Sequence, residues 1–140
     1  MERYKYFPHT ADAKFRSYGH TLEESFANAA LATASLMWDW KKINHKIEHL
    51  VEVEGRDLKQ LLVNFLEEVL YLFESSKFLL AAVDRINIEK KDNKFFLKAV
   101  FKGDKYKQKY KIHGDVKAIT YNEMKFFNND HFTIQVVVDI

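Results

Sequence analysis

Two segments of the chain carry the apolar spacing of three and four residues that gathers side chains on one face of a helix. In the first segment that face is made by Leu22, Phe26, Ala29, Ala30, Thr33 and Met37. In the second segment it is made by Leu58, Leu61, Leu62, Phe65, Val69 and Leu72. Each helix has to bury its apolar face against another element, so the rest of the chain must supply that element.

Both predicted helices have a marked start. Residues 21–24 form a capping box, in which the Thr21 hydroxyl accepts the Glu24 amide and the Glu24 carboxylate reaches back to the Thr21 amide. Asp57 predicts the cap of the second helix, which we expect to end between residues 73 and 75.

The remaining segments alternate between apolar and polar residues, which is typical of strands with one buried face. We expect strands at 13–17, 46–54, 83–89, 94–102, 116–127 and 131–139. Turns are predicted at 91–93, 103–104 and 128–130, and a ladder of lysines on one strand face at 105–111. This order predicts an α+β fold, with two helices packed on a mostly antiparallel sheet.

Composition restricts the class of protein. The 140 residues are 47% hydrophobic, which is enough for one core, and we expect a single domain over residues 1–140. The net charge of +2 gives no overall attraction to nucleic acid, so RNA contact is expected to be indirect or weak. The chain has no cysteine, and no segment reaches the roughly 18 apolar residues of a membrane span, which predicts a cytoplasmic protein.

Two chain regions offer oxygen ligands for a hard cation. Asp12 ends the stretch 9–12 (His-Thr-Ala-Asp) just before a predicted strand. Near the other end, the apolar positions of 132–140 share the core face and leave Asp139 opposite, with Thr133 and Gln135. Asp139 and the terminal carboxylate of Ile140 would then form a compact anionic site that needs a cation. The alternatives are a hydrogen-bonded turn at Asp12 and a solvated, frayed terminus.

Basic and aromatic side chains suggest two further contacts. Lys117 and Tyr121 flank Ile119 in a predicted strand, so they could bind an anionic site or a phosphate. The lysines at 105–111 could follow an RNA backbone or an acidic protein surface. In both segments the alternative is an ordinary solvated strand face.

Several motifs together resemble the archease family. They are the 9–12 box, the helix entry at 19–26, the helix at 57–70, the strand at 116–121 and the closing Asp139-Ile140. The resemblance extends over essentially the whole chain, in the same order and at similar spacing. It implies an α+β fold that contains a strand-helix-strand-strand module.

The resemblance also implies a function. Archease-like proteins are accessory proteins rather than enzymes, and they activate the GTP-dependent tRNA-splicing ligase of the RtcB family by promoting its guanylylation and multiple turnover. They bind a divalent metal, here expected to be calcium, with manganese or magnesium as alternatives. The implied metal ligands are Asp12, Asp139 and Ile140. His9, Lys117 and Tyr121 are the implied contacts to the partner or to a phosphate.

The chain departs from the family pattern at three places. It has Gly103-Asp104 where Gly-Glu is common, Asn122 where a histidine is common, and a short segment at 111–115. Two other functions stay open. One is a chaperone-like modulator of another tRNA-processing enzyme, such as a tRNA methyltransferase, and the other is a small metal-dependent hydrolase with His9 or His113 as base. The sequence does not indicate an oligomeric state.

Overall fold

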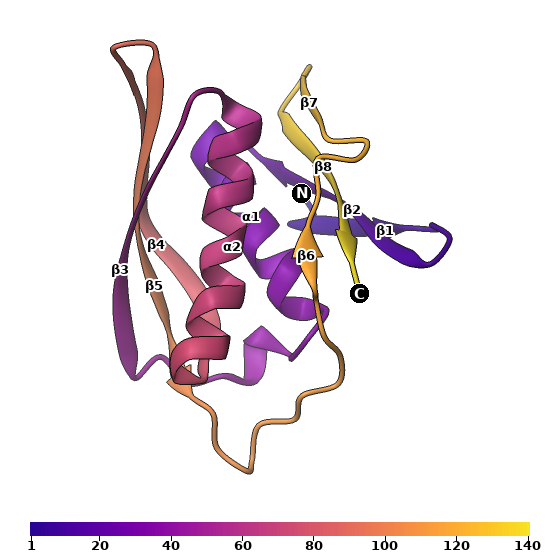
Figure 1. Ribbon diagram of the computed structural model, residues 1–140, viewed down its shortest axis with the longest axis vertical. Coiled ribbons are helices and arrows are strands. Elements are labelled where there is room, and N and C mark those ends of the chain that lie inside the picture. The colour runs from indigo at the N-terminus through magenta and orange to yellow at the C-terminus, as the bar shows by residue number, and fades with distance from the viewer.

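The computed structural model describes residues 1–140, and its two helices lie between two antiparallel sheets (Figure 1). The elements in chain order are β1 (Tyr4–Phe7), β2 (Asp12–Gly19), α1 (Leu22–Ser35), the 3-10 helix η1 (Trp40–Lys42), β3 (Ile47–Gly55), α2 (Leu58–Ser76), β4 (Phe78–Lys91), β5 (Lys94–Lys105), β6 (Ala118–Ile119), β7 (Lys125–Asn128) and β8 (Phe132–Asp139). One sheet has the order β1-β2-β8-β6, with β7 also on β8, and the other has the order β3-β5-β4. The predicted α+β fold is confirmed, and its strands divide into two sheets.

Local sequence accounts for the helix ends. The Thr21 hydroxyl accepts the Glu24 amide at 3.0 Å, as predicted. The Glu24 carboxylate accepts the His20 amide at 2.8 Å, so the return bond goes to the residue before the cap rather than to Thr21. Asp57 caps the start of α2, and Lys77, which follows the last helical residue Ser76, has a left-handed conformation (φ 58°). Neither helix is both long and apolar enough to cross a membrane.

The strand-helix-strand-strand module is formed by β3, α2, β4 and β5. The long β4–β5 hairpin turns at Asp92 and Asn93, which have φ values of 53° and 63°. Short polar residues tolerate this left-handed conformation, which explains why the 91–93 turn could be predicted from sequence.

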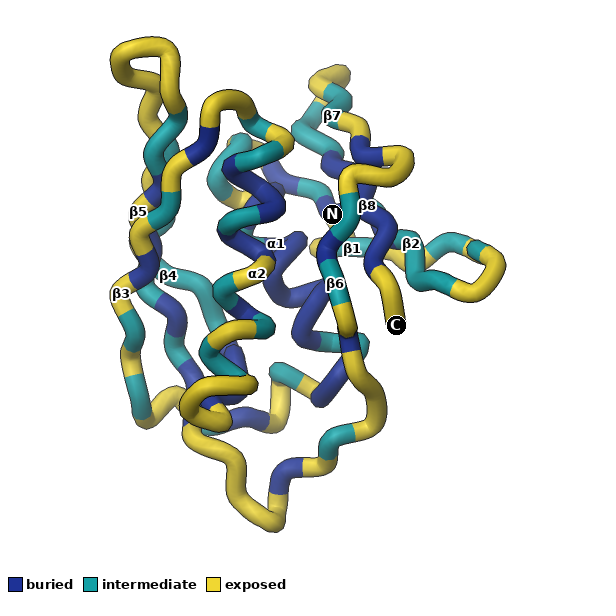
Figure 2. Tube along the Cα trace, viewed as in Figure 1, coloured by how far each residue is buried: buried dark blue, intermediate teal, exposed yellow.

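One hydrophobic cluster joins both sheets to both helices, and the buried positions run through the middle of the molecule (Figure 2). Aromatic rings connect the layers. The Phe65 ring on α2 lies 6.1 Å from Phe26 on α1 and 5.5 Å from Phe101 on β5. The Phe26 ring lies 6.3 Å from Phe126 on β7. The helices therefore hold the two sheets together through a shared core.

The turn predicted at Gly103-Asp104 is wrong, because both residues are buried in β5 opposite β4. A Cβ atom at Gly103 would overlap the carbonyl oxygen of Leu79. Gly103 therefore does not turn the chain. It allows β5 to approach β4 closely, beside the bulge of β4 between Leu80 and Ala82.

The strands predicted at 105–111 and 116–127 are also wrong. β5 ends at Lys105, and the chain stays irregular up to the two-residue strand β6, so the lysines share no strand face. β6 and β7 are separated by a turn in which Glu123 has φ 54°. Tertiary contacts replace the regular pairing that the alternating pattern indicated.

A buried carboxylate anchors the irregular segment. Asp104 is 2% exposed and accepts hydrogen bonds from the Tyr110 hydroxyl at 2.6 Å and the Lys107 ammonium at 2.8 Å. These two bonds lower the pKa of Asp104 from 3.8 to about 2, with the Lys107 bond the larger cause. The segment after β5 is therefore held to the sheet by a charged hydrogen-bond network.

We expect Gly103→Ala to destabilise the fold by about 2 kcal/mol or more, because the added methyl group must displace the β4 backbone. Chemical denaturation measures the change. Lys98→Ala, at an exposed position of the same strand, should shift the free energy of unfolding by less than about 0.5 kcal/mol. Equal stability of both variants would contradict the close approach.

Asp104→Asn should lower the free energy of unfolding by about 1–3 kcal/mol at neutral pH. Because the folded pKa lies below the ordinary value, the stability contributed by ionised Asp104 is complete above about pH 4. It is lost as the pH falls from there to about 2. The gap between wild type and variant, measured by urea denaturation, should thus shrink on acidification, and a constant gap would show that the carboxylate charge is unimportant.

Candidate functional site

The pairing of β2 with β8 places Asp12 directly opposite Asp139. Directly opposed residues of an antiparallel pair project from the same face of the sheet, so the two carboxylates are neighbours. On the other side of β8, Ala118 pairs with Asp139, and the Lys117 amide donates to the Asp139 main-chain oxygen at 2.7 Å. The predicted convergence of the two chain regions is therefore present in the structure (Figure 1, where β2 begins near the end of β8).

A strained turn sets the position of Asp12. Ala11, immediately before β2, has φ 65°, a left-handed conformation that costs a residue with a Cβ roughly 1–2 kcal/mol. The turn returns the chain so that Phe7 pairs with Lys14, and it brings His9 back over β2. Strain at this position is maintained because β2 is paired on both edges.

His9, Lys14 and Glu123 form a polar cluster on the outer face of the sheet. His9 Nε2 lies 2.9 Å from Glu123 Oε2, and Lys14 donates to Glu123 Oε1 at 3.1 Å. The hydrogen bond with His9, followed by that from Lys14, lowers the pKa of Glu123. His9 Nδ1 is buried without a hydrogen-bond partner and lies 3.7 Å from the Asp12 carboxylate.

The same face of β8 is buried further along the strand, contrary to the predicted alternation. Arg16 donates to the Gln135 side chain at 3.0 Å, and Gln135 donates to the Glu123 main-chain oxygen at 2.8 Å. Gln135 was expected to be exposed with Asp139, yet it is 2% exposed. The 120–124 turn covers this face and takes up its hydrogen bonds, which leaves Asp139 as the exposed end of the strand.

The predicted site residues have different positions. Lys117 contacts the aspartate pair through its main chain. Ile140 was predicted to lie on the core face, and this prediction is wrong, because the residue is 49% exposed. Tyr121 is 50% exposed and its hydroxyl makes no hydrogen bond. Lys117 and Tyr121 are both exposed while Ile119 is buried, so the three do not share one strand face.

Sequence reasoning missed Glu123 and Lys14. They are separated by 109 positions, and Glu123 lies 114 positions from His9, so no local spacing could have connected them. The one available signal was the (i, i+3) relation between His9 and Asp12, which the structure brings to 3.7 Å.

The donor set suits a hard cation only in part. The aspartate pair supplies carboxylate oxygens, the ligands that calcium and magnesium prefer, and the unpartnered His9 Nδ1 marks a polar, unsatisfied spot beside Asp12. No three side chains of the His, Cys, Asp and Glu types gather closely enough to hold a metal. Calcium takes about six to eight oxygen ligands, so the remaining ligands would have to come from the Ile140 main chain, water or a partner.

The fold is a two-sheet α+β domain in which half-buried Asp12 and exposed Asp139 form a pair of carboxylates where β2 begins and β8 ends. The chain belongs to the archease family: the Archease protein family (MTH1598/TM1083) matches residues 4–140. Proteins of this family are accessory factors in tRNA processing.

Individual relatives agree with this assignment. The chain is 39% identical to Protein archease of Pyrococcus furiosus over 143 residues, with both chains covered completely. The solution structure of Methanobacterium thermoautotrophicum protein 1598 superposes with a TM-score of 0.85 at 30% identity, again over all of both chains. The crystal structure of a Thermotoga maritima archease, described as a possible chaperone, shares the fold, with a TM-score of 0.58 at 19% identity and coverage of 97% and 96%.

We expect Asp139→Asn to raise the free energy of unfolding by up to about 1 kcal/mol in a chelator, because it removes like-charge repulsion across the β2–β8 pair. The gain, measured by denaturation at low salt, should diminish at high salt. Asp130→Asn, in the turn before β8, is the matched control and should change little. A loss of stability for Asp139→Asn would show that its carboxylate makes a favourable contact.

Proposed function

We propose that this protein activates an RtcB-type, GTP-dependent tRNA-splicing ligase by promoting its guanylylation and multiple turnover, through a divalent-metal site at Asp12, Asp139 and Ile140. The observation that carries the proposal is the register of β2 and β8, which sets the two aspartates side by side. Membership of the archease family supports the choice of partner.

The chain's own groups favour a bound cation at this position. Lys14 is paired with Glu123 and Lys117 presents only its main-chain amide to Asp139, so neither ammonium neutralises the aspartate pair. The only basic side chain beside the pair is the His9 imidazole, with Nδ1 3.7 Å from the Asp12 carboxylate. Two adjacent carboxylates without an ammonium or guanidinium partner attract a divalent cation, and an all-oxygen donor set fits calcium, with manganese or magnesium as alternatives. When bound, such a cation offsets negative charge that develops on phosphates.

The surroundings of the site are suited to contact with a partner. Asp139, Ile140, Lys117 and Tyr121 are all exposed at this part of the molecule. Tyr121 and Ile140 are among the few large apolar side chains that are about half exposed, and partly exposed aromatic and aliphatic groups are typical anchors of protein interfaces. We infer that the ligase covers this surface and completes the ligand shell of the metal.

A chaperone-like role toward another tRNA-processing enzyme, such as a tRNA methyltransferase, is the second candidate. The observation that favours it is the description of the Thermotoga maritima structure as a possible chaperone. Affinity purification from the native organism separates the two, because a ligase and a methyltransferase are different proteins to recover.

The direct test is guanylylation of the ligase by labelled GTP at substoichiometric amounts of this protein. We expect Asp12→Asn and Asp139→Asn to reduce stimulation by about tenfold or more, because each replaces a charged carboxylate ligand by a neutral amide oxygen that binds the cation more weakly. Calcium should raise the melting temperature of the wild type but not of these variants, since binding to the folded state stabilises it.

The matched control is Asp130→Asn, which changes the charge equally and lies away from the pair. It should stimulate like the wild type. Unimpaired stimulation by both site variants would remove the metal site from the mechanism, and absence of stimulation by the wild type would remove the ligase as partner.

A further inference from the structure

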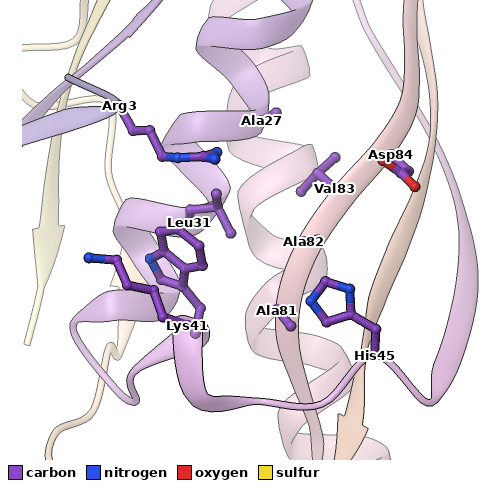
Figure 3. Close-up of a pocket in the computed structure, with 10 residues that line it drawn as sticks. Arg3, Ala27, Leu31, Lys41, His45, Ala81, Ala82, Val83 and Asp84 are labelled. Atoms are coloured by element: carbon purple, nitrogen blue, oxygen red, sulfur yellow. The ribbon is translucent and has the colours of Figure 1, made fainter. Parts of the chain in front are cut away.

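Two hollows lie on either side of η1, apart from the aspartate pair. The first, of about 410 Å³, lies between α1, η1 and β4, with Arg3 and His45 at its rim (Figure 3). The second, of about 340 Å³, lies between residues 39–43 and 109–113. Trp40 and Lys41 line the first hollow and Lys42 lines the second, so η1 separates them.

Basic side chains without an acidic partner surround both hollows. They are Arg3, Lys41, His45, Lys42, Lys109, Lys111 and His113. None of them takes part in an ion pair, although eight such contacts occur elsewhere in the molecule. Two acidic residues also line the hollows, but Lys102 binds Asp84 at 2.8 Å and Asp39 caps η1. The local charge therefore favours an anion with several negative groups.

The first hollow can receive a flat apolar body. Its floor includes the small side chains Ala27, Ala81 and Ala82, which leave the space open (Figure 3). The Trp40 indole is fixed by a hydrogen bond to the Tyr4 hydroxyl at 2.9 Å, and the Arg3 guanidinium and the Lys41 ammonium lie over its ring, 5.2 Å and 5.6 Å from the ring centre. A guanidinium held over an aromatic ring can stack its plane on a nucleobase and direct its charge to the adjoining phosphate.

The second hollow is built on the anchored segment that follows β5. The Tyr110 hydroxyl is bound to Asp104, and the His113 amide donates to the Met37 main-chain oxygen at 2.9 Å. Lys109 and Lys111 therefore extend from a fixed backbone rather than from a loose loop. Ammonium groups held in this way bind phosphates with less loss of conformational entropy.

We propose that these two hollows form a binding surface for single-stranded RNA, with a base in the first hollow and backbone phosphates along the second. The three residues of η1 span about 6 Å, so one short strand can reach both hollows. This inference rests on the proposed function in one respect only, the choice of RNA rather than DNA as the nucleic acid.

An acidic peptide fits this surface less well. β4 is an edge strand, which could in principle accept a peptide strand. However, its register shifts between Leu80 and Ala82 and again between Asp84 and Asn87, so the regular stretch beside the hollow is too short for strand addition.

The test is fluorescence anisotropy of a labelled single-stranded RNA of about ten nucleotides, without ligase and with a chelator present. The variant Lys42→Gln/Lys109→Gln/Lys111→Gln should bind at least about tenfold more weakly, with a salt slope reduced by about two. The control Lys59→Gln/Lys91→Gln/Lys94→Gln removes the same charge from exposed positions elsewhere and should bind like the wild type.

Ala27→Leu fills the first hollow and should lower RNA affinity by about fivefold or more at an unchanged salt slope, because it removes stacking and leaves the charges. Thermal unfolding confirms that each variant is folded. Equal losses in the test and control triple variants, or tighter binding of a polyglutamate peptide than of the RNA, would overturn the proposal. Because neither ligase nor metal is present, a failure here is distinct from a failure of ligase activation.

Discussion

The antiparallel pairing of β2 with β8 is the interaction on which the rest of the structure depends. It joins residues 12–19 to residues 132–139 and so makes the centre of the five-stranded sheet from opposite ends of the chain. Phe15 and Val136 meet on its inner face and pack into the core, while Asp12 and Asp139 meet on its outer face. A shift of one residue would exchange the two faces, so burial of the core side chains also determines the position of the carboxylates.

The candidate metal site combines several features that oppose stability. Two like charges face each other, Ala11 is held in a left-handed conformation, and His9 Nδ1 is buried without a partner. Each of these is unfavourable in the isolated protein. They persist because β2 is paired on both edges and its neighbours hold the turn in place, with Glu123 in contact with both His9 and Lys14. Such a concentration of unfavourable features is expected where binding of a ligand or partner relieves them.

The near-neutral net charge conceals an uneven distribution. The aspartate pair lies at one position and the unpaired basic groups gather around η1 at another, and the segment from Lys111 to Lys117 connects the second hollow to Asp139. Composition alone could show neither, because lysines and aspartates are mixed along the chain. If both proposals hold, the cation site of the proposed function and the RNA-binding surface around η1 would allow one small domain to contact both the ligase and its RNA substrate.

Features that depend on neighbours within a few residues were predictable from sequence. The caps at Thr21 and Asp57, the apolar helix faces and the 91–93 turn follow from contacts of three or four positions. The aspartate pair was also anticipated, on the resemblance to a family and on the alternation of the last strand. Burial of Asp104, the irregular course of 106–117 and the contact of Glu123 with His9 were decided by tertiary structure alone. The partners of these residues are distant in the sequence or lie in another layer. No local pattern encodes which polar groups will be buried together, because the energy of their hydrogen bonds and ion pairs is gained only once the layers have packed.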